Sequence, residues 1–223
     1  MSTNKFFKKQ DIEKITQATA AAEKSTAAEI VTVITESSND YKRYTFLAAI
    51  IANFVFTLFI LVFTDFYISI FKPFFWEMTY NHIIVITTFL QGLIFTIFYL
   101  LFSINSLKYL IVPKKRMDNE VRTKAESAFY RHNISATADA TGVLIYISFF
   151  EHRVELLVDY KIAETFPKSQ WQDIVNNIIK GIKTNTFIDA ICQQILKIGE
   201  MLTPVFPIKP DDINELPDAP IIE

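Results

Sequence analysis

EIVTVITESSNDYKRYTFLAAIIANFVF, residues Glu29 to Phe56, begins like a strand of a soluble domain and ends like a membrane segment. Ile30 to Thr35 is rich in β-branched residues, which favour a buried strand. A short polar segment follows, and no residue from Tyr44 to Thr64 is charged. The pattern predicts a soluble domain that is interrupted, soon after its first strand, by a segment that crosses a membrane.

The composition favours a membrane protein and gives no electrostatic case for nucleic acid. Hydrophobic residues make up 51% of the 223 residues, with 21 Phe and only 4 Gly, and the formal net charge is -2. A nucleic-acid-binding chain usually carries a basic excess, which is missing here. The single cysteine, Cys192, excludes an internal disulfide and a cysteine metal cluster, so we expect it to be a small core residue.

Two uncharged runs are long enough to cross a bilayer as helices. They are expected at about 44–64 and 83–107, and a hydrocarbon core of about 30 Å needs roughly 20 apolar residues. A buried helix of a soluble protein is the rival interpretation, but such a helix usually keeps a polar face that both runs lack. The polar residues inside the spans are expected to hydrogen-bond between the two helices rather than to line a transport path. Aromatic residues of the connecting loop are expected at the membrane interface; they are Tyr67, Trp76 and Tyr80.

The basic residues predict the orientation of these spans. Those that flank the spans on the domain side are Lys42, Arg43, Lys108, Lys114, Lys115 and Arg116. The connecting loop has only Lys72, which Asp65 and Glu77 offset. Because basic residues concentrate in cytoplasmic loops, we expect a multi-pass protein of the cytoplasmic (inner) membrane with both termini in the cytoplasm.

The remaining sequence predicts helices and strands that complete one soluble domain. A first helix is expected from near Gln10, and a second after Pro113, with Val121, Ala125, Ala128 and Phe129 facing inward. Val143–Phe149 and Arg153–Asp159 are expected to form a hairpin of two strands.

Two further helices are expected after the hairpin. One should begin at Ser169, where Gln172 completes a capping box, and the other at Thr186, while the tail should be extended. Together these elements predict an α/β fold: a small central sheet with helices on both faces, interrupted by a two-helix transmembrane hairpin. The expected division is 1–43 for the first part of the domain, 44–112 for the hairpin, 113–207 for the second part and 208–223 for a proline-rich tail.

The soluble part resembles the TPM-domain family, which includes thylakoid-lumen and photosystem II repair proteins, a receptor-modulator protein and bacterial membrane proteins. The resemblance covers most of the soluble part in the same order along the chain, and the NELPD of residues 214–218 resembles the bacterial branch. The matching stretches are AEKSTAAEIVTVI (22–34), AFYRHNISATADATGVLIYISFFEHRVELLVD (128–159), SQWQDIVNNIIKGIK (169–183) and AICQQILKIGEMLTPVFP (190–207).

The resemblance implies two different functions. Some plant members are acid phosphatases with a divalent metal beside the sheet, where an Asp-Asn-Gly segment precedes the apolar strand and a glycine-rich turn follows its partner. This chain has Ala140, Thr141 and Gly142 in the first segment and Asp159, Tyr160 and Lys161 in the second, so it keeps one glycine and loses the others. These departures favour a non-enzymatic role, in which we expect no cofactor.

Asp139, Arg153 and Asp159 are the candidate ligand-binding residues, because oxygen ligands and an arginine suit a hard cation or a phosphate. The structural alternative is that Asp139 lies in a turn, Asp159 ends a strand and Arg153 pairs with Glu151. Glu29 is expected to be a solvated cap of the first strand.

The main hypothesis is a membrane-held interaction or assembly module that contacts the lipid bilayer and another membrane protein or itself, without nucleic acid. The alternative is a calcium- or magnesium-dependent, phosphatase-like hydrolase on the same fold.

Overall fold

The chain forms two units in the computed structural model, which describes residues 8–74, 79–184, 186–209 and 213–223. The first unit combines Met1–Asn39 with Lys114–Glu223, and the second is Asp40–Pro113. Trp76 and Glu77, which enter the predictions for the loop, lie outside the described residues.

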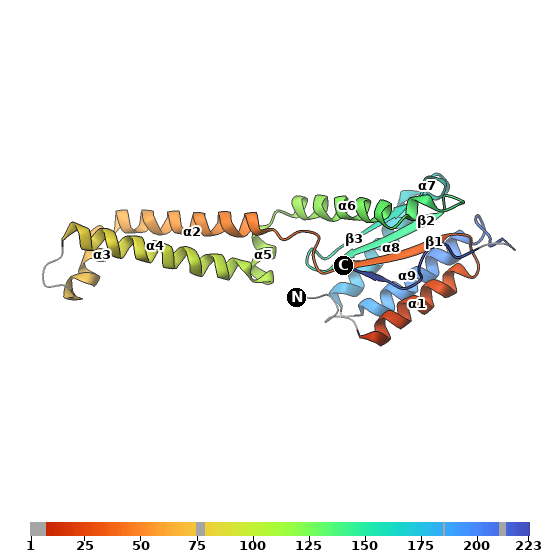
Figure 1. Ribbon diagram of the computed structural model, residues 1–223, viewed down its shortest axis with the longest axis horizontal. Helices are drawn as coiled ribbons and strands as arrows, with labels where there is room; N and C mark the ends of the chain where they lie inside the picture. The colour runs from red at the N-terminus through yellow and green to blue at the C-terminus, as the bar shows by residue number, and fades with distance from the viewer. Residues whose placement is uncertain (1–7, 75–78, 185, 210–212) are drawn as a thin grey trace. The chain divides into compact units, whose positions relative to one another are not determined.

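The first unit contains a four-stranded sheet in the order β3-β2-β1-β4 (Figure 1). β1 (Glu29–Thr35) is parallel to β2 (Gly142–Ser148), and β2 is antiparallel to β3 (Arg153–Val158). The strand that precedes the insertion therefore pairs with a strand that follows it, more than a hundred residues later in the chain. This pairing joins the two stretches of the first unit into one sheet.

The fourth strand corrects the expectation of a merely extended tail. β4 (Ile221–Ile222) is parallel to β1, with Val33 opposite Ile221 and Ile34 opposite Ile222. The backbone N–H of Glu223 also donates to the carbonyl of Ile34 at 3.0 Å. Unpaired strand edges invite unwanted pairing, and the tail pairs with this edge at Val33 and Ile34. A two-residue strand is too short to leave a periodic pattern in the sequence.

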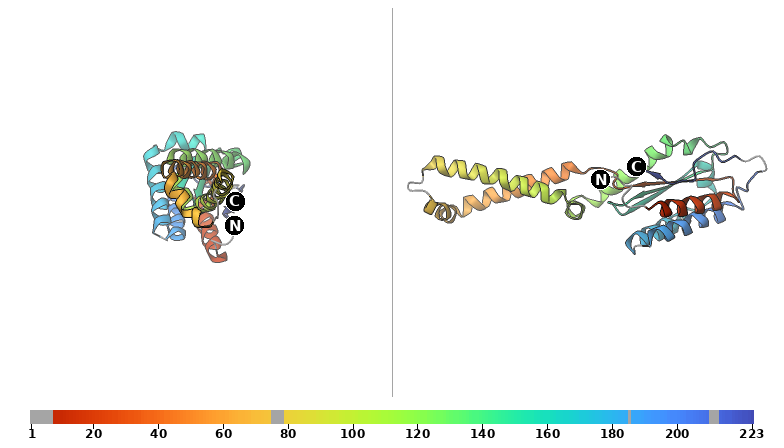
Figure 2. Two further views of the ribbon diagram at one scale, coloured as in Figure 1. Left: turned by 90° about the vertical axis from the view of Figure 1, so that its left-hand side faces the viewer. Right: turned by 60° about the horizontal axis from the view of Figure 1, so that its bottom comes forward.

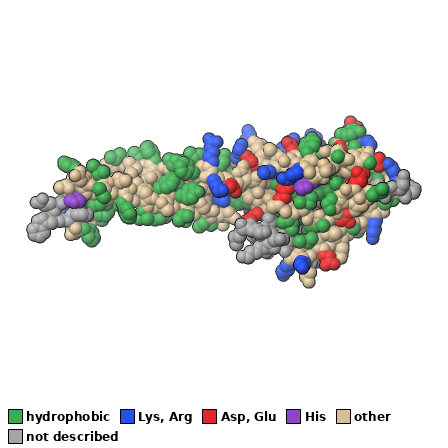
Figure 3. Space-filling model, viewed as in Figure 1, with side chains coloured by type: hydrophobic (Ala, Val, Ile, Leu, Met, Phe, Trp, Pro, Cys, Tyr) green, Lys and Arg blue, Asp and Glu red, His purple; other side chains and the backbone are tan. Residues whose placement is uncertain are grey.

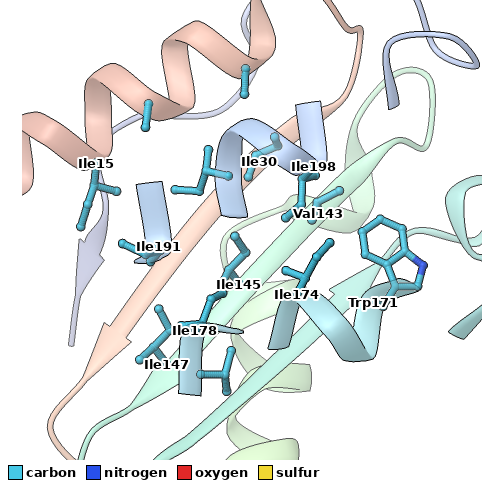
Figure 4. Packing of buried hydrophobic residues seen from close by; sticks show 14 of the residues in the cluster. Ile15, Ile30, Val143, Ile145, Ile147, Trp171, Ile174, Ile178, Ile191 and Ile198 are labelled. Atoms are coloured by element: carbon cyan, nitrogen blue, oxygen red, sulfur yellow. The ribbon is translucent and has the colours of Figure 1, made fainter. Parts of the chain in front are cut away.

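Helices cover both faces of the sheet, which confirms the predicted fold class. One face is covered by α1 (Lys9–Glu23), α8 (Lys168–Lys183) and α9 (Phe187–Leu202), and the other by α6 (Lys114–Arg131). Figures 1 and 2 show α1 and α9 side by side. The larger core cluster lies under these helices (Figure 4) and includes Ile15, Ile30, Val143, Ile145, Ile147, Ile174, Ile178, Ile191, Ile195 and Ile198.

The alternation of side chains along β1 and β2 divides the core in two. Ile30 and Ile34 belong to the cluster under α1, α8 and α9, whereas Val31 and Val33 belong to the cluster under α6. All seven positions of each strand are buried. A strand covered on both faces has no solvent side, which explains the nearly continuous apolar runs in the sequence.

Two helical details around Pro167 differ from expectation. A short helix, α7 (Tyr160–Thr165), follows β3 directly. The predicted capping box at Ser169 is wrong, because α8 begins at Lys168 with Pro167 as its N-cap residue and without a side-chain cap. Pro167 has a φ of -68°, and Ser169 lies inside the first turn, where its hydroxyl is past the capping position.

A 3-10 turn, η3 (Ile134–Ala136), connects α6 to the loop before β2.

The second unit is built around two long apolar helices. α2 (Lys42–Val62) and α4 (Tyr80–Ser103) contain 21 and 24 residues, so they are about 31 and 36 Å long at about 1.5 Å per residue. Both are long and apolar enough to cross a membrane. Shorter helices flank α4: α3 (Thr64–Phe71), η2 (Lys72–Phe74) and α5 (Asn105–Ile111). The second predicted span, 83–107, therefore runs past the end of α4 at Ser103 into α5.

Two hydrogen bonds between helices of this unit confirm part of the prediction for its polar residues. Gln91 Nε2 donates to Thr57 Oγ1 at 3.1 Å, between α4 and α2. The Tyr67 hydroxyl of α3 lies 3.0 Å from Thr87 Oγ1 of α4. These bonds satisfy polar groups at places where apolar side chains otherwise surround them.

Candidate functional site

Asp139 lies in the loop before β2 and is bound to two lysines. Its Oδ2 is 2.5 Å from Lys209 Nζ, and its backbone carbonyl accepts a hydrogen bond from Lys161 Nζ at 2.5 Å. The hydrogen bond from Lys209 holds the pKa of the Asp139 carboxyl below its ordinary value. The residue therefore stays ionised and is engaged with the tail.

Asp159 follows β3 and caps α7. Its Oδ1 accepts the backbone N–H of Tyr160 at 2.8 Å, as the N-cap residue of that helix. Its own backbone N–H donates to the carbonyl of Gly142 at 2.9 Å, which places it beside the start of β2. Asp159 and the loop that carries Asp139 therefore share one end of the sheet.

Arg153 lies at the opposite end of β3, where it is paired with Ser148. A strand of this length spans about 17–20 Å, so Arg153 does not converge with Asp159 on one ligand. The expected contact with Glu151 is wrong, because Arg153 Nε instead lies 2.5 Å from Oδ1 of Asp118 in α6. The structure brings two of the three candidate residues to one end of the sheet and leaves the third at the other.

Glu151 is fully buried in the turn between β2 and β3. Its Oε1 accepts the backbone N–H of Ser38 at 2.9 Å, and its Oε2 accepts the hydroxyl of Ser148. These bonds attach residues 37–39, where the chain leaves β1, to the turn. Glu151 has a structural role that sequence reasoning missed, because its donors come from distant parts of the chain.

Glu23 and Glu29 line a pocket of about 310 Å³ beside the tail. The prediction that Glu29 is solvated is wrong, because only 9% of it is exposed and it accepts the backbone N–H of Glu215 at 3.1 Å. Burial raises the pKa of Glu23 to about 8, and the neighbouring Glu29 and Asp218 raise it further. The pocket lies between α1, the start of β1 and the tail.

Among the described residues, no group of three or more His, Cys, Asp or Glu side chains could hold a metal ion. Asp139 and Asp159 are the acids that the sequence nominates for a cation, and the structure gives each a separate hydrogen-bond partner.

The second unit presents apolar side chains outward over the length of its long helices. Phe54, Val62, Phe89 and Leu100 are each more than 60% exposed. On the face seen in Figure 3, no charged side chain interrupts the middle of the two helices. Soluble monomers rarely expose contiguous apolar surface on this scale, so a membrane or a protein partner is the environment that suits it.

Part of the chain matches a known family. The sequence model of the TPM domain matches residues 105–201. The NMR structure of BA42 protein from the psychrophilic bacterium Bizionia argentinensis sp. nov. is similar in fold, with a TM-score of 0.56 and 18% identity, over 98% of this chain and 96% of that chain. A comparison with curated proteins finds no match. The resemblance expected from the ordered stretches is thus confirmed, in that residues 105–201 match the model of the TPM domain.

Proposed function

We propose that this protein is an integral membrane protein whose α/β unit is a non-enzymatic interaction or assembly module. The observation that carries the proposal is the insertion of an apolar hairpin inside that unit. The unit is formed by residues on both sides of the hairpin, so the chain leaves this unit and returns to it. A hairpin that crosses a bilayer twice has this property, and it holds the module close to neighbouring membrane proteins.

The dimensions of the hairpin support insertion. Helices of about 31 and 36 Å match a hydrocarbon core of about 30 Å with some tilt. Within the most apolar window of α2 only 11% of residues are buried in the structure, and within that of α4 none is. A soluble core helix would be mostly covered by protein, so lipid is the better match for these side chains.

The distribution of charge supports a cytoplasmic module. The basic residues next to the α/β unit are Lys42, Arg43, Lys108, Lys114, Lys115 and Arg116. The connection between the spans carries Lys72 beside Asp65 and Glu77. The positive-inside rule then assigns both termini to the cytoplasm and the α3 side of the hairpin to the other side of the membrane.

The candidate polar residues support binding rather than catalysis. Arg153 is paired with Asp118, Asp139 with Lys209, and Asp159 caps α7. Each of these contacts stabilises the fold locally, and the three residues do not converge. The partner is another membrane protein or a second copy of this chain. The alternative, a phosphatase-like hydrolase, requires calcium or magnesium to bind at Asp139 or Asp159.

Cysteine labelling in intact cells tests insertion and orientation. In a Cys192→Ala background, Ser69→Cys of α3 should react with a membrane-impermeant maleimide. Glu164→Cys of α7 should react only after the membrane is permeabilised. Labelling of Glu164→Cys alone in intact cells would reverse the orientation, and labelling of both before permeabilisation would argue against two spans.

Chemical cross-linking in native membranes tests the interaction module. The full chain at its natural level should appear in cross-linked species larger than the monomer, and Asp139→Ala should leave them unchanged. A protein that remains monomeric and alone under these conditions would remove the proposal.

A further inference from the structure

β3 is an edge strand with backbone groups that point away from the sheet. The N–H of Asp159 donates to Gly142 of β2, so alternate residues back along β3 also face β2. The N–H and C=O groups of Val154, Leu156 and Val158 therefore point outward. β4 pairs with Val33 and Ile34 on the outer side of β1, but no described strand pairs with β3 on its outer side.

A groove of about 840 Å³ runs along this edge between α6 and α8. We call it the β3 groove. Its apolar residues come from β3, α7, α8 and the segment before α8, and they include Leu156, Val158, Ala163, Phe166, Trp171 and Val175. The charged and polar residues of the lining are Asp118, Arg122, Arg153 and Glu155 next to α6, and Lys168 and Gln172 of α8. The groove therefore offers apolar contacts beside β3 and α8 and acidic and basic groups at its margins.

Trp171 supplies an unused hydrogen-bond donor in this groove. The residue is only 8% exposed, and its indole N–H is buried with no acceptor among the described residues. Its ring packs edge-on against Phe166, with centroids 5.9 Å apart. Figure 4 shows the indole nitrogen turned away from Ile174. A buried donor without an acceptor is costly, and a backbone carbonyl in the groove would satisfy it.

Glu155 sets the charge that a ligand should carry. Its carboxylate makes no ion pair or hydrogen bond with a described side chain, and burial raises its pKa above the ordinary value. Arg122 and Arg153 face it, but these two are bonded to Glu126 and Asp118. A lysine or arginine opposite Glu155 would provide the missing ion pair across neighbouring strands.

We propose that the β3 groove binds an extended segment of a partner protein as an additional strand. The segment would have apolar residues at alternate positions, facing Leu156 and Val158, and a basic residue on its other face, opposite Glu155. Main-chain bonds to the outward groups of β3 would hold it, as in other cases of strand addition. The proposal rests on the proposed function as an interaction module and specifies what that module recognises.

A segment without flanking helices suits this groove better than a second copy of the sheet. In a second copy, β3 also lies between its own α6 and α8, so the helices of the two copies would meet before the two strands did. The opposite edge of the sheet gives an example of a strand without flanking helices. There the two residues of β4 pair with β1, and Glu223, which follows them, binds Arg131.

Peptide binding to the full chain in lipid nanodiscs tests the proposal. The probe is a fluorescein-labelled, capped peptide with the core Val-Lys-Val-Lys-Val, which places lysine opposite Glu155 in either strand direction. Controls replace both lysines with glutamate, or the central valine with proline. Fluorescence anisotropy should show saturable binding of the lysine peptide, with the glutamate peptide about fivefold weaker and the proline peptide at least about tenfold weaker.

Three variants identify the groove as the binding site. Glu155→Lys should reverse the preference between the lysine and glutamate peptides. Trp171→Phe keeps the ring but removes the N–H, and should weaken binding about fivefold. Leu156→Pro removes one outward N–H of an edge strand and should abolish binding, while Leu196→Ala, at an exposed position of α9 outside the groove, should not change it. Circular dichroism establishes that each variant is folded.

Each outcome has one meaning. Absence of saturable binding by the lysine peptide, or equal binding by all three peptides, would overturn the proposal. Self-association that Leu156→Pro abolishes, without peptide binding, would make a second copy the occupant and also overturn it. If the peptides do not bind but the full chain still forms cross-linked species in native membranes, the proposal of an interaction module stands. Only the β3 groove is then excluded as its binding site. If both fail, the proposed function fails as well.

Discussion

The backbone N–H of Ile30, at the start of β1, donates to Oε1 of Glu23, the last residue of α1, at 2.8 Å. This bond ties the first helix to the first strand. It holds the carboxyl beside Glu29 and Asp218, which belong to the strand and to the tail. Burial and these two acids raise the pKa of Glu23 from 4.5 to about 8.

Stability should therefore fall as the pH rises. The folded protein keeps the Glu23 proton up to a pH of about 8, whereas the unfolded chain loses it near 4.5. Between these values the folded state binds more protons, so the free energy of unfolding decreases with pH and levels off above about 8. Glu23→Gln keeps the acceptor for Ile30 and should flatten this curve. At high pH the free energy of unfolding of Glu23→Gln should exceed that of the wild type by about 1–2 kcal/mol, a range that is reduced to account for the partial exposure of Glu23.

Urea unfolding of the full chain in detergent, followed by circular dichroism over this pH range, measures the effect. Glu13→Gln, exposed on the same helix, is the matched control. Its curve of unfolding free energy against pH should be parallel to that of the wild type. Parallel curves for Glu23→Gln as well would show that Glu23 has an ordinary pKa.

The crossing of α1 and α9 should tolerate no side chain at Gly199. A Cβ added there would lie 2.8 Å from Cβ and 2.9 Å from Cα of Ala22. Gly199→Ala should destabilise the first unit by about 1–3 kcal/mol, reduced by up to about 1 kcal/mol of helix propensity. Gly92→Ala is the control, because a Cβ at Gly92 meets nothing within 4 Å. Thermal unfolding in which Gly199→Ala matches the wild type would contradict this close packing.

The hairpin should lose stability when its interhelical hydrogen bond is removed. Gln91→Leu deletes the donor to Thr57 and should weaken the association of α2 and α4 by about 0.5–1.5 kcal/mol. Thr96→Val is the control, because the Thr96 hydroxyl donates only within α4, to the carbonyl of Gly92. Unfolding in mixed micelles with increasing SDS provides the measurement. Equal midpoints for the two variants would mean that the Gln91–Thr57 bond contributes nothing.

Calcium and magnesium should leave the melting temperature unchanged if the α/β unit is a binding module. A cation present at about 100 times its dissociation constant would stabilise the folded state by about 2.7 kcal/mol, which is a shift of several degrees. The comparison is the full chain with millimolar metal and with EDTA. A shift that Asp139→Ala or Asp159→Ala abolishes would favour the hydrolase instead.

Local sequence patterns were sufficient for most of the fold. The periodicity of α1, α6, α8 and α9 and the apolar runs of β1 and β2 predicted elements that the structure contains. Their boundaries moved by a few residues, as at Ser169, because a proline and its neighbours can begin a helix in more than one way. The uncharged hairpin was predicted from length and composition alone.

The candidate site could be predicted only in part. The sequence nominated Asp139, Arg153 and Asp159 as residues near strand ends, and this is where they lie. It could not show that Arg153 and Asp159 occupy opposite ends of β3, or that Asp118 takes the arginine. The sequence did not show that Trp171 and Glu155 line one groove, because a core tryptophan and a strand glutamate look ordinary in the sequence.

Composition and periodicity determined on their own that this chain has an α/β unit interrupted by an apolar hairpin, because burial in protein or lipid imposes patterns within a few turns of helix. Only the tertiary structure decided which strand lies at an open edge. Strand order depends on pairing between residues far apart in the chain, as between Val33 and Ile221. Among the described strands, β4 pairs with the outer side of β1 at Val33 and Ile34, whereas none pairs with the outer side of β3, and no local pattern carries that difference.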